Sequence, residues 1–172
     1  MSADGVATDD ARGGRARNGG ADALPVFRGL SRLALDAKGR LAVPTRHREA
    51  LDGNGAGLVV TVDPSQCLLV YPRAAWEPIQ ARLMGLSSFD PRMRGLQRLI
   101  VGHADDVELD AAGRILIPPP LRQYARLDKH VVLVGQGHRF ELWDEAAWQA
   151  QTAQVIAFGG SPLPSELDGF SL

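Results

Sequence analysis

The chain contains the stretch Leu35-Asp36-Ala37-Lys38-Gly39-Arg40-Leu41-Ala42-Val43-Pro44, and a close copy of it follows as Leu109-Asp110-Ala111-Ala112-Gly113-Arg114-Ile115-Leu116-Ile117-Pro118. The two stretches begin 74 residues apart, and the same spacing relates Arg48 to Arg122. Beyond the Gly-rich loop 52–57 the spacing becomes 72 residues, and the match continues through the next hairpin and helix. A loop absorbs such a change in length at little cost. The chain therefore contains two copies of one supersecondary unit.

Each copy predicts the same order of elements. A strand leads into an Asp-x-x-Gly turn, in which the Asp side chain accepts backbone hydrogen bonds and Gly adopts a positive φ. The next strand ends at a proline, which cannot donate to a sheet and suits the start of the helix that follows. The strands on either side of the Asp-x-x-Gly turn are predicted to form a first hairpin, and a second hairpin and a second helix complete the unit. The predicted spans are strands at about 30–35 and 105–109, strands at 40–43 and 114–117, helices at 45–51 and 118–125, and hairpins of 58–62 with 67–71 and of 131–134 with 139–143.

One further helix is predicted between the copies, where Asp90 is the N-cap and Pro91 takes the first helical position. Residues 1–25 hold five glycines and no apolar period, so they are predicted to be disordered. The sequence leaves open whether translation begins at Met1 or at Val26. The predicted organisation is a disordered tail (1–25), a first repeat (26–86), a linker helix (87–104), a second repeat (105–156) and a C-terminal tail (157–172).

Composition limits the classes of function. The apolar runs are too short to span a bilayer, and residues 1–25 lack the apolar segment of a signal peptide. The single cysteine, Cys67, excludes an internal disulfide framework and a cysteine-based zinc finger. The four histidines have no mutual metal-ligand spacing, and Gly135-Gln136-Gly137 fits a hairpin turn better than a phosphate loop. We therefore expect no metal, no cofactor and no enzymatic site.

A unit of this size is too small to bury its own apolar face, so the two copies are expected to pack on each other. With pseudo-twofold symmetry they would form one closed β core, and the predicted fold class is α+β, mainly β, with short flanking helices. The two Asp-x-x-Gly-Arg turns would then lie on one face. A pair of related turns that each carry an arginine suits a repeated or palindromic ligand, of which DNA is the obvious case.

The charge distribution favours the first copy as the DNA contact. The formal net charge of the whole chain is −1, but residues 26–50 hold six basic and two acidic residues. Residues 103–130 hold four basic and five acidic residues, so the first copy is better suited to phosphate. The candidate DNA-binding residues are Arg40, Lys38, Arg114, Arg28, Arg46 and Arg48.

Arg40 is the foremost of these candidates, because a guanidinium can pair with guanine through two bonds or clamp a phosphate. The alternative is that Arg40 braces its hairpin by pairing with Asp36, and both roles are compatible. The residues expected to shape the two turns without binding a ligand are Asp36, Gly39, Asp110 and Gly113.

Several motifs together resemble the MraZ family of transcriptional regulators. They are Val26-Phe27-Arg28-Gly29, Asp36-x-Lys38-Gly39-Arg40, Pro44-Thr45-Arg46-His47-Arg48-Glu49, Asp110-x-x-Gly113-Arg114, Arg98-Leu99-Ile100-Val101-Gly102-His103-Ala104, Val134-Gly135 and Phe140-Glu141-Leu142-Trp143-Asp144. The resemblance covers about residues 26–150, which is essentially the whole predicted globular part.

The resemblance implies a swapped-hairpin β-barrel of the AbrB kind, with both halves in one chain, that assembles into a ring-shaped homo-oligomer. It implies a cytoplasmic, nucleoid-associated repressor that binds repeats upstream of the division and cell-wall gene cluster, its own gene included. The functional motif of the family, Asp-x-x-x-Arg, falls on Asp36 to Arg40 and on Asp110 to Arg114. Ala112 stands where the first copy has Lys38, which indicates a less cationic second turn.

Three other functions are alternatives, and the sequence argues against two of them. A ring-forming protein-interaction module without specific DNA binding is the main alternative, and salt dependence would separate it from a DNA binder. An enzyme would need a cluster of titratable groups that the sequence does not show. Relatives of this barrel type also occur as antitoxins, but the two fused halves and the lack of an acidic toxin-wrapping tail argue against that role.

Overall fold

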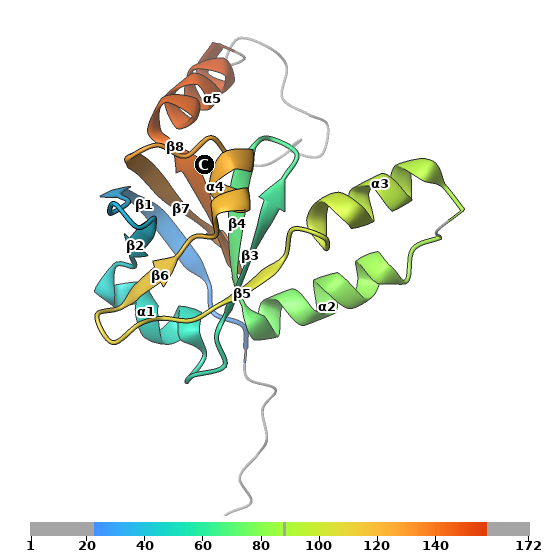
Figure 1. Ribbon diagram of the computed structural model, residues 1–172, viewed down its shortest axis with the longest axis horizontal. Helices are drawn as coiled ribbons and strands as arrows, with labels where there is room; N and C mark the ends of the chain where they lie inside the picture. The colour runs from blue at the N-terminus through green and yellow to red at the C-terminus, as the bar shows by residue number, and fades with distance from the viewer. Residues whose placement is uncertain (1–22, 88, 158–172) are drawn as a thin grey trace, which may run out of the picture.

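The structure is a computed structural model that describes residues 23–87 and 89–157. The predicted tails, 1–25 and 157–172, lie outside these residues except for residues 23–25 and 157. The described part of the chain forms eight strands and five helices, arranged as a six-stranded sheet, a two-stranded ribbon and flanking helices (Figure 1). None of these helices is long and apolar enough to cross a membrane.

The order of elements matches the predicted order in both copies. The first copy forms β1 (Phe27–Ala34), β2 (Arg40–Ala42), α1 (Thr45–Asp52), β3 (Leu58–Asp63), β4 (Cys67–Pro72) and α2 (Arg73–Met84). There follow α3 (Pro91–Ile100), β5 (Asp105–Val107), β6 (Arg114–Leu116), α4 (Pro119–Tyr124), β7 (His130–Gly137), β8 (Arg139–Asp144) and α5 (Glu145–Ala157). β1 is longer than predicted, because all eight of its residues pair with β7.

Strand pairing crosses between the two copies. The sheet has the order β1-β7-β8-β4-β3-β5, so the first strand of each copy lies beside the hairpin of the other copy. The ribbon likewise joins β2 of the first copy to β6 of the second copy. The predicted first hairpin of each copy is therefore wrong, because its two strands pair with the other copy, and across the first turn only Leu35 and Leu41 form an isolated bridge. Neither copy has a complete sheet of its own. The edges of the large sheet are β1 and β5, so its hydrogen bonds do not close it into the predicted barrel.

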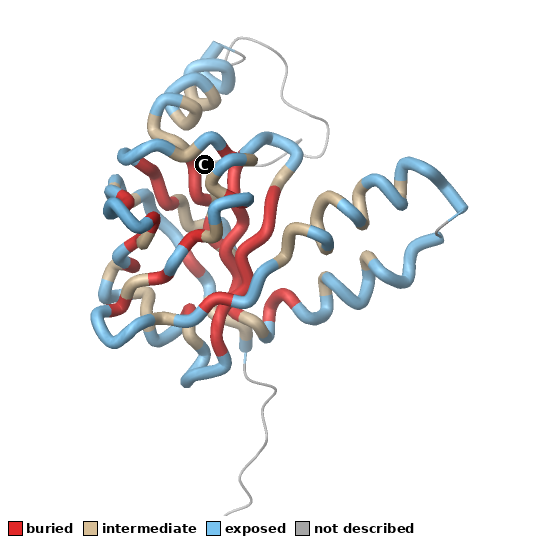
Figure 2. The backbone as a smooth tube through the Cα atoms, in the orientation of Figure 1, coloured by how far each residue is buried: buried red, intermediate tan, exposed pale blue. Residues whose placement is uncertain are grey.

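The main core lies between the ribbon and one face of the sheet. Leu41 and Ile115 point inward from the ribbon and are almost fully buried, and they belong to the same cluster as Leu68 and Phe140 of the sheet. A second cluster on the opposite face includes Trp76 and is packed by residues of α2 and α5. Figure 2 shows burial concentrated in the sheet, whereas α2 and α3 project from it as a largely exposed hairpin.

Gly135 permits the close contact between β7 and β1, and its replacement is predicted to destabilise the fold. A Cβ at this position would lie 2.5 Å from the backbone nitrogen of Arg28 and 2.7 Å from the carbonyl carbon of Phe27, and backbone atoms cannot rotate away. We expect Gly135→Ala to lower the free energy of unfolding by about 1–3 kcal/mol in urea denaturation.

The matched control is Gly95→Ala in α3, where an added Cβ meets no atom within 4 Å. This variant should be as stable as the wild type, or more stable by up to about 1 kcal/mol, because alanine favours helix. Equal stability of the two variants would contradict the tight β1–β7 contact.

Candidate nucleic-acid interface

The ribbon places two of the predicted arginines on one face. Its register pairs Arg40 with Leu116, Leu41 with Ile115, and Ala42 with Arg114. Because side chains alternate along a strand and Leu41 and Ile115 face the core, the other four residues face outward. Arg40 and Arg114 therefore share the outer face of the ribbon.

The turn before β2 is built around the carboxylate of Asp36. Its Oδ1 accepts hydrogen bonds from the backbone nitrogens of Lys38 and Arg40, both at 2.9 Å. The backbone nitrogen of Gly39 donates to the Asp36 carbonyl at 2.9 Å, and Gly39 has a φ of +80°. The Nε of Arg40 donates to Asp36 Oδ2 at 2.6 Å. A single aspartate thus shapes the turn and orients the arginine.

The turn before β6 repeats this arrangement. Asp110 Oδ1 accepts from the backbone nitrogens of Ala112 and Arg114 at 2.9 Å, and the Nε of Arg114 donates to Asp110 Oδ2 at 2.8 Å. The alternative role of Arg40, bracing of its turn by a pair with Asp36, is therefore observed, and Arg114 and Asp110 form the same pair in the second copy. A guanidinium carries five N–H donors, and the Arg40 and Arg114 side chains are 30% and 35% exposed, so donors remain for a ligand.

These bonds also determine the charge of the two aspartates. The backbone N–H of Arg40, and then its guanidinium, lower the pKa of Asp36 to about 2. The guanidinium of Arg114 lowers the pKa of Asp110. Both carboxylates are therefore ionised at neutral pH and remain paired with their arginines.

Two further arginines brace the turns across the two copies. Arg48 of α1 donates from Nε to the Val43 carbonyl at 2.8 Å, and its guanidinium lies against Gly113 of the other copy. Arg122 of α4 donates from Nε to the Ile117 carbonyl at 3.0 Å, and its guanidinium lies against Gly39.

A Cβ on Gly39 would be 2.6 Å from the Cζ of Arg122, so this glycine provides space as well as a positive φ. Arg122 is not among the residues predicted from the sequence, although its spacing from Arg48 pointed to an equivalent role. DNA contact by Arg48 stays a prediction, and its half-buried side chain already has a bracing role.

The other predicted residues lie in two places. Lys38 is exposed in the first turn, next to Arg40. Arg28 is exposed on β1, and Arg46 reaches from α1 toward the same strand, where its Nη2 is 3.4 Å from Ser31 Oγ. Arg46 also donates from Nε to His47 Nε2 at 2.9 Å, and burial lowers the pKa of His47. The turns and ribbon thus bring together Lys38, Arg40 and Arg114, whereas Arg28 and Arg46 lie at the junction of β1 and α1.

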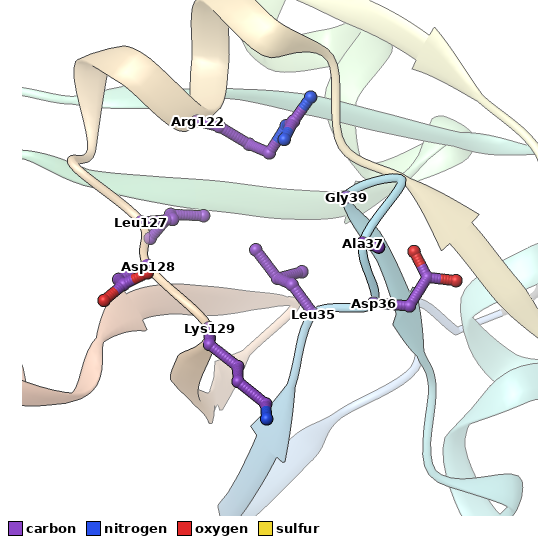
Figure 3. Close-up of a pocket in the computed structure, with 8 residues that line it drawn as sticks. All are labelled: Leu35, Asp36, Ala37, Gly39, Arg122, Leu127, Asp128 and Lys129. Carbon is purple, nitrogen blue, oxygen red and sulfur yellow. The ribbon is translucent and has the colours of Figure 1, made fainter.

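A cavity of about 470 Å³ opens beside the first turn. Figure 3 shows Leu35 and Leu127 extending into it, whereas the Asp36 carboxylate points away from it. Its charged lining is mixed and includes Arg122, Lys129 and Asp128. Across residues 23–87 and 89–157, no group of three or more His, Cys, Asp or Glu side chains is placed to hold a metal ion.

Comparison with known families gives a clear match. A family model described as "MraZ protein, putative antitoxin-like" matches residues 26–99 and matches again over 100–166. The chain belongs to the MraZ family. The double match confirms the predicted tandem repeat.

Several relatives carry the name "Transcriptional regulator MraZ". Those from Thiobacillus denitrificans and Methylobacillus flagellatus are each 57% identical over 148 residues, and that from Nitrosomonas europaea is 52% identical over 148 residues. Each alignment covers 86% of this chain and 100% of the relative. MraZ is a family of transcriptional regulators and not of enzymes.

Protonation of the Asp36 carboxylate is predicted to lower the stability of the folded chain in acid. Because the pKa of Asp36 is lowered from 3.8 to about 2 in the folded chain, its contribution is complete above about pH 4 and is lost as the pH falls toward 2. We expect the urea midpoint of the wild type to fall across this range. Asp36→Asn should have a lower urea midpoint than the wild type at pH 7. Below pH 4 its midpoint should decrease less with falling pH than that of the wild type.

The control for this titration is Asp105→Asn, which alters an exposed carboxylate on β5. Its acid profile should follow that of the wild type. An Asp36→Asn profile with the wild-type slope would show that the turn carboxylate does not couple to folding.

Proposed function

We propose that this chain is a sequence-specific DNA-binding transcriptional regulator that reads DNA with the outer face of the β2–β6 ribbon. The observation that carries the proposal is the pair of outward-facing, partly exposed arginines, Arg40 and Arg114, each oriented by its own aspartate. A two-stranded ribbon fits the major groove, where an arginine can pair with guanine through two bonds. Lys38 is placed for a phosphate, and Arg28, Arg46 and Arg48 are further candidates.

From the family resemblance we also propose where the protein acts, which genes it regulates and how several subunits bind. The protein acts in the cytoplasm, associated with the nucleoid, and represses the division and cell-wall gene cluster that includes its own gene. One chain offers few base contacts, so several subunits engage repeated sites, and such linkage raises affinity by about 10²-fold or more when the geometry permits.

We also propose how the two repeats together form the barrel. We infer a swapped-hairpin barrel of the AbrB kind, whose repeats comprise residues 26–86 and 105–156 around the linker 87–104. The pairing of β1 with β7, β3 with β5, and β2 with β6 supports it, because each pair joins the two copies. The barrel wall is then completed by packing of the ribbon over the sheet.

Fluorescence anisotropy tests the DNA-binding proposal directly. The probe is the region upstream of this protein's own gene, compared with a scrambled duplex of equal length at about 50 and 200 mM salt. We expect tight, salt-sensitive binding to the upstream region alone. Arg40→Ala should weaken it by about 5- to 150-fold, because a bidentate contact contributes about 1–3 kcal/mol.

The matched control is Arg82→Ala, which removes an exposed arginine from α2 and should change affinity much less. Equal affinity for the upstream and scrambled duplexes would overturn the proposal. Specific binding that survives Arg40→Ala would keep the function and move the contact to Lys38 or Arg114.

A second candidate function is that of a protein-interaction module, and one observation favours self-association. Phe89 belongs to the segment between α2 and α3 and is 95% exposed, and Met84 and Leu86, a few residues before it in the chain, are exposed as well. Exposed apolar residues that gather in one place are typical of contact surfaces. We propose that this segment contributes to assembly of the ring.

Light scattering coupled to size exclusion tests this assignment. Phe89→Ser should reduce the mass of the assembly, because it removes a large apolar side chain that is 95% exposed. Val155→Ala, an exposed apolar residue on α5, provides the control and should keep the wild-type mass. An unchanged mass for Phe89→Ser would place the contact elsewhere.

A further inference from the structure

Leu116 occupies an unusual place on the ribbon. It lies on the outer face, is 51% exposed, and stands directly opposite Arg40 in the antiparallel register. Directly opposed residues on one face of such a pair have Cβ atoms about 4.5–5.5 Å apart. A large apolar side chain therefore stands beside the foremost candidate for base contact, on a face whose other large side chains are arginines.

The fold itself does not account for this leucine. Core packing of β6 is carried by the neighbouring Ile115, which is 1% exposed. The equivalent residue of the first copy is Ala42, which has the same outward place on β2 and leaves the ribbon intact. Since a half-exposed leucine gains little from the hydrophobic effect, its side chain is available to a partner.

The surroundings of Leu116 indicate the chemistry of that partner. Arg40 and Arg114 share its face and keep N–H donors beyond those paired with Asp36 and Asp110, and Lys38 in the adjoining turn leaves a net positive charge, so the partner presents hydrogen-bond acceptors and negative charge. It must also present an apolar group next to them. In the major groove of DNA that group is the 5-methyl of thymine, which lies beside the acceptors of neighbouring bases.

We propose that Leu116 contacts a thymine 5-methyl group next to the base that Arg40 reads, an inference that rests on the proposed DNA-binding function. The separation of opposed Cβ atoms, about 4.5–5.5 Å, spans between one and two base-pair steps of about 3.4 Å, so the two flexible side chains can reach neighbouring bases. At the other end of the ribbon, Ala42 stands opposite Arg114 and reaches less far. The two halves of the ribbon therefore read different bases, and the site of one chain is not a palindrome.

Replacement of thymine by deoxyuridine tests the contact, because it removes only the 5-methyl group. Wild type, Leu116→Ala and Val155→Ala are each measured by anisotropy on the upstream region prepared with thymidine or with deoxyuridine. For the wild type and Val155→Ala, the deoxyuridine probe should bind about three- to fivefold more weakly, the effect of losing one buried methyl group. Leu116→Ala should bind both probes equally. Single-position replacements then locate the thymine.

The outcomes distinguish failure of the proposed DNA-binding function from failure of the thymine contact alone. If the wild type does not prefer the upstream region to the scrambled duplex, the proposed function fails and this inference with it. If specific, salt-sensitive binding persists but wild type and Leu116→Ala show the same ratio between the two probes, only the thymine contact is overturned. A lower assembly mass for Leu116→Ala with an unchanged ratio would also overturn it and assign Leu116 to contact between subunits.

Discussion

Pairing between the two copies is the constraint on which the rest of this structure depends. β2 and β6 are three residues long, and neither could persist as a strand without the other. Their pairing buries Leu41 and Ile115 over the sheet and at the same time presents Arg40 and Arg114 outward. The same antiparallel pairing thus places core side chains on one face of the ribbon and the candidate DNA-binding side chains on the other.

The turns are held by contacts that also cross between the copies. The backbone nitrogen of Val43 donates to the Gly113 carbonyl, and that of Ile117 donates to the Gly39 carbonyl, both at 3.0 Å. Arg48 and Arg122 pack over these glycines from helices of the opposite copy. Each arginine-bearing turn is therefore supported by the other half of the chain, which gives the interface the rigidity that base recognition requires.

Elements that depend on local residues could be predicted from the sequence. The Asp-x-x-Gly turns and the helix start at Asp90 are set by hydrogen bonds within a few residues, so residue type and spacing were sufficient. The residues alone did not predict the partner of each strand, because the pairing of β1 with β7 and of β2 with β6 joins segments far apart in the chain. Exchange between the copies was expected only from the family resemblance. The role of Arg122, and the exposure of Leu116 beside Arg40, emerge only when that register is known.

Fusion of two copies in one chain allows the halves to differ in a way that a homodimer cannot. Residues inside the ribbon stay apolar in both halves, with Leu41 opposite Ile115, because both must fill the same core. The outer residues are free of that requirement, and there Ala42 corresponds to Leu116 and Lys38 to Ala112. A homodimer would present identical halves and would read a symmetric site. The fused chain keeps the symmetric core, and its outer face is free to differ between the halves, as recognition of an asymmetric sequence would require.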